Sequence, residues 1–232
     1  MPVRTLLLFG LAAALCWTAA DILLVGFPRL PPTAAPFAPD VAAALADDAD
    51  MAALMLGGSP ERLFWGVLPA TFSIILYLAA SWGVYRLMRP SALAKAAWLL
   101  LLCSYAWSPL GHAGFYYVGM AAQGLAAAPP HAQGIFLAQF RHFMDMLAVH
   151  WLAAVGLSIL AWTAVLLQTL RGRTILPKWA ALFNPVPVGV AIALGCSFFP
   201  ESVAAASLGG ASLNAAQLVF FATAWCLVKK TQ

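Results

Sequence analysis

Long apolar runs separated by short polar stretches make up the chain, and their length limits the fold more than any other feature. Six runs approach or exceed the roughly 20 apolar residues that a helix needs to cross the hydrocarbon core of a bilayer. They are residues 5–27, 63–85, 91–127, 133–170, 179–199 and 212–228. Only 9% of the residues are charged, against roughly 25% in a soluble domain. The sequence therefore predicts an all-α, polytopic membrane bundle of six transmembrane helices.

The cations divide unevenly between the two ends of these helices. If the N-terminus is cytoplasmic, nine Lys and Arg residues flank the cytoplasmic ends and three lie at the outer ends. The inner group is Arg4, Arg86, Arg89, Lys95, Arg171, Arg173, Lys178, Lys229 and Lys230, and the outer group is Arg29, Arg62 and Arg141. Because Lys and Arg accumulate in cytoplasmic loops, we expect a single domain over residues 1–232 in a bacterial inner membrane, with both termini cytoplasmic.

The third and fourth runs are longer than a bilayer requires. About 36 helical residues extend about 54 Å at ~1.5 Å per residue, whereas the hydrocarbon core is ~30 Å thick. We expect two long antiparallel helices that project from the outer face, the first kinked at Pro109. The alternative is a break at residues 108–111, but it would move the basic residues 171–173 to the outer side. The outer loop at residues 28–60 is predicted to contain a short helix with Asp40 as its N-cap.

Polar side chains recur at one level of this predicted bundle. Counted from the cytoplasmic ends at ~1.5 Å per residue, Asp21, His112 and Asn214 lie about 22–26 Å up, and His150 lies about 31 Å up. An ionisable group inside a membrane is costly and normally faces the bundle interior or a water-filled cavity. We therefore predict an outward-facing polar pocket, with His112, His150 and Asp21 as candidate catalytic residues.

A second set of candidates would bind a ligand rather than react with it. The set consists of Asp145, His142, Arg141, Asn214 and Arg62. Arg141 and Asp145 are four residues apart, so they share a helix face and can form an ion pair. Structural alternatives are an ion pair at the membrane edge for these two residues, an interfacial position beside Trp151 for His150, and a helix–helix hydrogen bond for Asn214.

His112, His150 and Asp21 are also candidate ligands for a divalent metal, because imidazole and carboxylate groups bind zinc. The spacings HEXXH, HxxxH and CxxC do not occur in the sequence. His142 and His150 are about 12 Å apart along one helix, which is too far for one ion. The sequence thus leaves the cofactor open.

Five short segments resemble an uncharacterised bacterial family of small multi-pass membrane proteins, described only as a domain of unknown function. They are AADILL around Asp21, ERLFWGVLPATFSIILYLAASWGVYRL in the second run, GHAGFYYVG around His112, FFP at 198–200 and LGGASLNAAQLVFF at 208–221. The resemblance implies a membrane protein of six or seven helices and implies no activity. Residues 140–151 lie outside these segments.

Three functions fit these residues. An enzyme would hydrolyse or isomerise a lipid or isoprenoid, with His112 or His150 as general base or metal ligand and Asp21 orienting it. A transporter or binding protein would use Asp21 as counter-ion or proton site for a small solute. A structural subunit would bind a partner through the two long helices. Membrane lipid is the expected partner, a homo-oligomer or a membrane partner stays open, and the lack of a Lys/Arg run argues against nucleic acid.

Overall fold

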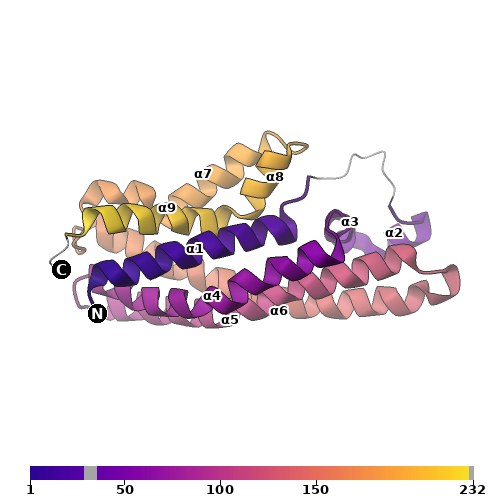
Figure 1. The fold of residues 1–232 in the computed structure, drawn as a ribbon, viewed down its shortest axis with the longest axis horizontal. Helices are drawn as coiled ribbons and strands as arrows, with labels where there is room; N and C mark the ends of the chain where they lie inside the picture. The colour runs from indigo at the N-terminus through magenta and orange to yellow at the C-terminus, as the bar shows by residue number, and fades with distance from the viewer. Residues whose placement is uncertain (29–35, 230–232) are drawn as a thin grey trace.

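The computed structural model describes residues 1–28 and 36–229, and its regular elements there are helices, apart from one isolated bridge between Met88 and Thr174 (Figure 1). The α-helices are α1 (Val3–Val25), α2 (Pro39–Leu45), α3 (Ala49–Met55), α4 (Pro60–Leu87), α5 (Ala92–Ala127), α6 (Gln133–Leu170), α7 (Pro185–Ser197), α8 (Val203–Gly210) and α9 (Ser212–Leu227). Three short 3₁₀ helices are η1 (Ala46–Asp48), η2 (Pro130–Ala132) and η3 (Lys178–Phe183). The predicted all-α class is confirmed.

Four of the described helices are long and apolar enough to cross a membrane, namely α1, α4, α5 and α6. The pair α8 and α9 passes the same test together but bends by 71° at its junction, so it is a fifth span only if the bent pair counts as one. Helix α7 has 13 residues, fewer than the roughly 20 of a simple crossing. The structure thus supports four to five candidate spans.

The fifth apolar run of the sequence is divided because of the proline that follows Asn184. A residue before proline is disfavoured in the α conformation, and Asn184 is extended with φ −68° and ψ 144°. Its side-chain Oδ1 accepts a hydrogen bond from the Val186 backbone N–H at 3.0 Å, which caps α7. The run therefore forms η3 and then the short α7, with Asn184 as the N-cap between them.

The two long helices pack against each other along their length as an antiparallel pair (Figure 1). Helix α5 is continuous from Ala92 to Ala127 with Pro109 inside it, so the alternative break at residues 108–111 is wrong. Gly111 makes the close approach possible, because a Cβ there would lie 3.1 Å from the Cα of Trp151 on α6. The α5–α6 turn lies beyond the end of α1 in Figure 1.

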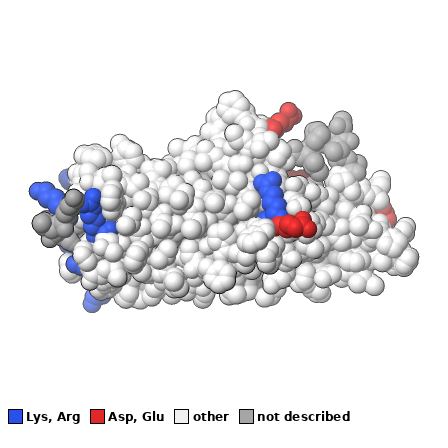
Figure 2. Space-filling model, viewed as in Figure 1, with Lys and Arg blue, Asp and Glu red and all other residues white. Residues whose placement is uncertain are grey.

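The described chain begins and ends at the same end of the bundle (Figure 1), and Lys and Arg side chains gather there (Figure 2). Arg86, at the end of α4, donates a hydrogen bond to the Met1 carbonyl at 2.7 Å. The Arg89 N–H donates to the Arg173 carbonyl at 2.8 Å, which joins the start of the α5 segment to the end of α6. The acidic side chains visible in Figure 2 lie in the opposite half of the molecule. Two cations used in the sequence argument, Arg29 and Lys230, lie outside the described residues.

The described part of residues 28–60, which we predicted to be an outer loop with one short helix, contains two short α-helices joined by η1. Helix α2 begins at Pro39 with Ala38 as its N-cap, so the prediction of Asp40 as the cap is wrong. Proline needs no hydrogen bond at the first position of a helix, which explains the earlier start. Helix α3 follows and buries Ala52 and Met55 completely, and it packs on α5.

The buried side chains form two clusters, one toward each end of the bundle. The cluster near the termini includes Leu7, Leu101 and Phe221, and the other includes Leu24 and Leu63. Lipid-facing positions are also apolar, as large exposed side chains on the long helices show. The candidate site lies where the two clusters meet, because residues of both line it.

Candidate functional site

A cavity of about 610 Å³ is lined by residues of α1 and of all the helices from α3 to α9. Its aromatic lining residues are Trp17, Phe27, Tyr77, Tyr105, Phe115, Trp151 and Phe199. Its polar lining residues are Asp21, His112, Asn214, Gln217 and the serines at 104, 108, 158, 197 and 212. Among the described residues that line the cavity, Asp21 is acidic and none is Lys or Arg. The cavity is therefore an aromatic chamber with one carboxylate.

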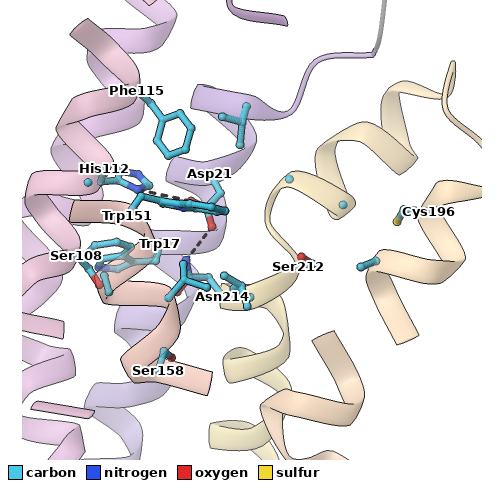
Figure 3. Close-up of a pocket in the computed structure, with 18 of the residues that line it drawn as sticks. Trp17, Asp21, Ser108, His112, Phe115, Trp151, Ser158, Cys196, Ser212 and Asn214 are labelled. Atoms are coloured by element: carbon cyan, nitrogen blue, oxygen red, sulfur yellow. Dashed lines mark hydrogen bonds and ion pairs between the residues drawn. The ribbon is translucent and has the colours of Figure 1, made fainter. Parts of the chain in front are cut away.

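Asp21 is held by side chains from two other helices (Figure 3). Asn214 Nδ2, in the first turn of α9, donates a hydrogen bond to Asp21 Oδ2 at 2.8 Å. His112 Nδ1, on α5, lies 3.6 Å from Asp21 Oδ1, a distance longer than a hydrogen bond but within reach of an ion pair. The Asp21 side chain is 15% exposed and that of His112 is 5% exposed. The carboxylate thus remains accessible from the cavity, while the imidazole is buried behind it.

A chain of hydrogen bonds fixes the direction of the Asn214 amide. Tyr77 Oη donates to Asn214 Oδ1 at 2.9 Å, and Gln217 Nε2 donates to the same oxygen at 3.4 Å. Tyr105 Oη in turn donates to Gln217 Oε1 at 2.5 Å. Because its oxygen is used as an acceptor by these groups, Asn214 must present its NH₂ group to Asp21. The network orients the carboxylate through a neutral donor rather than a cation.

Aromatic rings pack against the residues of this hydrogen-bond network. The Tyr77 and Tyr105 rings are stacked, with centroids 4.4 Å apart and an interplanar angle of 11°. Trp17 lies one helical turn before Asp21, and its ring centroid is 4.8 Å from that of His112. The polar groups of the site are therefore set on an aromatic platform contributed by α1, α4 and α5.

His112 and the nearby serines do not form hydrogen bonds with one another. His112 Nε2 is buried and has no hydrogen-bond partner within the described residues. Ser108 Oγ, four residues before His112, donates to the Ser104 carbonyl at 2.8 Å. Ser104 Oγ donates to the Ala154 carbonyl on α6 at 2.7 Å. These two hydroxyls bond backbone carbonyls, so neither is paired with the imidazole.

The structure brings together three of the residues singled out in the sequence and separates the others. Asp21, His112 and Asn214 meet at the cavity, whereas the remaining five do not line it. Those five are His150, Asp145, His142, Arg141 and Arg62. His150 Nδ1 instead bonds the Met146 carbonyl one turn earlier at 2.8 Å, and the next residue, Trp151, lines the cavity.

The predicted ion pair between Arg141 and Asp145 is wrong. Arg141 Nη2 donates a hydrogen bond to the Ala44 carbonyl of α2. In the described residues, the contact within ion-pair distance is that of His112 with Asp21. Arg141, His142 and Asp145 are exposed, because this part of α6 turns their side of the helix away from α5. Arg141 thus serves to hold α2 against α6.

Arg62 has a structural position at the end of α1. Its Nη2 donates to the Ile22 carbonyl at 2.8 Å and lies 3.5 Å from the Gly26 carbonyl. Its guanidinium carbon is 4.2 Å from the centroid of the Phe27 ring. The last carbonyls of a helix lack partners within the helix and attract cations. Arg62 therefore joins the start of α4 to the end of α1 and does not line the cavity.

Within the described residues, the structure brings two of the three predicted metal ligands together and leaves the third apart. Asp21 and His112 lie together, but His150 is elsewhere on the surface of α6. No group of three or more His, Cys, Asp or Glu side chains suitable for a metal ion occurs in the described part of the chain. The set of His112, His150 and Asp21 is therefore not brought together.

Sequence reasoning missed several residues of the site. Gln217 lies three residues after Asn214, which puts both amides on one face of α9, and this spacing was a usable signal. Trp17 lies four residues before Asp21 on α1, with the same consequence. Tyr77 and Tyr105 gave no comparable signal, because their contact joins α4 to α5 and depends on how the helices pack.

Comparison with known proteins places the chain in a family. The sequence profile of a family of unknown function (DUF6796) matches residues 2–231. The chain belongs to this family. The predicted resemblance to an uncharacterised family of membrane proteins is confirmed, since the match covers nearly the whole chain and the structure has apolar helices of membrane-spanning length. No curated protein and no solved structure matches the chain.

Proposed function

We propose that this member of the DUF6796 family is a multi-pass membrane protein that binds an amphipathic molecule, whose polar head donates hydrogen bonds to Asp21. The observation that carries the proposal is one accessible carboxylate, oriented by Asn214, in an aromatic cavity of about 610 Å³. Ligand sites commonly have volumes of about 300–1,000 Å³, apolar walls and a few oriented polar groups. The cavity fits this description.

The lining favours an amine or an alcohol as the head group. Asp21 offers two acceptor oxygens, and the aromatic rings of Trp17 and Trp151 line the same space. Aromatic faces attract cations at close range. A phosphate or carboxylate head would find no Lys or Arg among the described lining residues and would be repelled by Asp21. We therefore expect a cationic or neutral donor head on an apolar body.

Binding is favoured over hydrolysis by the position of His112. A general base must come within about 2.6–3.2 Å of the group that it deprotonates. His112 Nε2 is buried, Nδ1 faces Asp21, and the Ser108 hydroxyl is bonded to a backbone carbonyl. A Ser–His pair is thus not assembled at the cavity. The role that suits His112 best is a positioning residue behind the carboxylate.

The proposal includes the placement of a single domain over residues 1–232 in a bacterial inner membrane. We propose six passages through α1, α4, α5, α6, α7 and the bent α8–α9 pair, with both termini cytoplasmic and the α5–α6 turn projecting outside. The cations at the end that holds both termini support this orientation (Figure 2). An even number of passages also suits two termini at one end (Figure 1).

Reporter fusions test this topology. A fluorescent protein fused after residue 174 or after the C-terminus is expected to fold, whereas alkaline phosphatase is expected to be active after residue 129 or 200. Phosphatase activity at the C-terminal fusion would overturn the proposed orientation. Activity at residue 200 that is no higher than at residue 174 would overturn the crossing by α7.

The binding proposal is tested with purified protein in lipid nanodiscs and radiolabelled dodecylamine, measured by scintillation proximity. Asp21→Asn keeps the shape and the bond to Asn214 but removes the charge. A hydrogen bond to a charged group is worth about 1.5–3 kcal/mol, so we expect affinity to fall about 10- to 100-fold. Asp145→Asn, an exposed carboxylate outside the cavity, is the matched control and is expected to bind like the wild type.

Competition with unlabelled compounds of the same chain length tests the head-group preference. Dodecylamine and dodecanol are expected to displace the label, whereas dodecyl phosphate is not. If the Asp21→Asn and Asp145→Asn variants bind dodecylamine equally well, the carboxylate is not the binding group and the proposal is wrong.

A further inference from the structure

The outer end of the cavity is covered by the segment that precedes α4. Met51 and Leu54 of α3 line the cavity, together with Phe27. This segment is fastened to the long helices at two points. Arg141 on α6 donates to the Ala44 carbonyl of α2, and Gln123 Nε2 on α5 donates to the Gly58 carbonyl at 2.7 Å. The described part of the outer segment therefore stands between the cavity and the outer aqueous side.

On another side of the cavity, α6 and α7 are joined by a hydrogen bond at one end of α7 and line the cavity at the other. At the start of α7 the two helices are joined, since Asn184 Nδ2 donates to the Trp162 carbonyl at 3.1 Å. Toward the other end, both helices become walls of the cavity, with Val155 and Ser158 on α6 and Ala193 and Ser197 on α7. Helix α7 packs mainly on α8 and α9 there. Figure 3 shows Cys196 on α7 standing across the cavity from Ser158 and Ser108.

The walls that α6 and α7 contribute to the cavity lie beside side chains that suit lipid. Trp151, which lines the cavity from α6, is 40% exposed. On the facing helix, Leu194 is 59% exposed and Val190 is 55% exposed. Large exposed apolar side chains on a membrane-spanning helix face hydrocarbon rather than water. Lining residues of the cavity on α6 and α7 thus lie beside side chains that suit hydrocarbon.

We propose that the ligand is a membrane-dissolved amphiphile with an alkyl chain, which reaches the cavity sideways between α6 and α7. Its donor head lies at Asp21, and its chain lies in a lateral opening between Val155 and Ala193. This inference rests on the proposed function, since it assumes that Asp21 receives the head. It adds the class of the ligand, which is a lipid-soluble amine or alcohol, and the route by which that ligand enters.

A photoreactive probe tests where the chain lies. The probe is dodecylamine with a diazirine near the end of its chain, added to the protein in nanodiscs. After irradiation, labelled residues are located by mass spectrometry of chymotryptic peptides. We expect labelling on α6 at 151–158 and on α7 at 190–197, lost in Asp21→Asn and reduced by excess unlabelled dodecylamine.

The other outcomes separate the two proposals. Labelling of Met51 and Leu54 that still depends on Asp21 would mean that the chain points to the outer end, so the lateral route is wrong and the proposed function stands. Labelling that is unchanged by Asp21→Asn and by competitor reflects bulk lipid contact and would overturn both proposals.

A pair of substitutions on α7 tests the opening itself. Ala193→Trp fills it, because Ala193 lines the cavity and is exposed. Ala191→Trp is the matched control, since Ala191 is exposed on the same helix but does not line the cavity. We expect Ala193→Trp to reduce competable labelling to the level of Asp21→Asn, while Ala191→Trp labels like the wild type. Equal labelling of the two variants would overturn the lateral route.

Discussion

Replacing Arg62 with methionine tests whether this residue stabilises the fold, as its contacts indicate, or binds ligand. Methionine retains an unbranched apolar stem and removes the guanidinium. The change eliminates the hydrogen bond to the Ile22 carbonyl at 2.8 Å and the contact with the Phe27 ring at 4.2 Å. The 3.5 Å approach to the Gly26 carbonyl is too long to add much.

The expected loss follows from these two contacts. A hydrogen bond from a charged donor contributes about 1.5–3 kcal/mol, and a partly exposed cation–π contact contributes about 0.5–1 kcal/mol. The free energy of unfolding should therefore fall by about 2–4 kcal/mol. For a chain of 150–250 residues, each kcal/mol shifts the Tm by about 2–4 °C, so we expect a Tm lower by about 4–16 °C.

The assay is thermal unfolding in detergent, followed by the size-exclusion peak of the folded protein after heating. Glu61→Gln is the control, because Glu61 is the exposed neighbour of Arg62 at the start of α4. Arg62→Lys should give an intermediate Tm, since lysine can reach one carbonyl but lacks the planar group that covers the ring. If Arg62→Met melts at the same temperature as Glu61→Gln and yet loses dodecylamine binding, Arg62 belongs to the binding site and the structural argument is wrong.

Two further substitutions test the packing and the network around the cavity. Gly10→Val should destabilise the protein by about 1–3 kcal/mol, because a Cβ at Gly10 would collide with the Phe221 ring of α9. SDS-induced unfolding measures this loss. The control is Gly156→Val, which should be nearly neutral because a Cβ at Gly156 would meet nothing within 4 Å. Asn214→Leu should weaken dodecylamine binding in the nanodisc assay, because it removes the donor that orients Asp21. Unchanged affinity in that variant would show that the carboxylate needs no such support.

The common level of Asp21, His112 and Asn214 along the bundle was predictable from the sequence, but the side of each helix that faces the site was not. The rise per residue of an α-helix is constant, so counting from the cationic ends placed Asp21, His112 and Asn214 at one height. His150 was placed at a similar height by the same reasoning and turned out to lie away from the cavity. Height alone does not distinguish a residue in the interior from one on the outside.

On α6 the sequence did not distinguish the residues that face the interior from those that face outward, and the reason is physical. A soluble helix reveals its buried face by alternation between apolar and polar residues. In a membrane the outer face is apolar too, because lipid tails are as apolar as leucine. Leu147 is buried and Leu152 is exposed, yet the two are identical in sequence terms. Rotation of α6 about its axis was therefore not encoded in hydropathy.

The sequence alone determined properties of single segments, namely the all-helical class, the long helices and the cationic end. These depend on the length of apolar runs and on local charge, which act before any helix meets another. Tertiary structure decided the properties that depend on pairs of helices. It joined Asn214 to Asp21 across 193 positions, assigned Arg62 to the end of α1, and placed residues of α6 and α7 in the lining of one cavity. Such contacts depend on shape and on close approach at small residues, and a linear pattern of hydropathy contains no record of either.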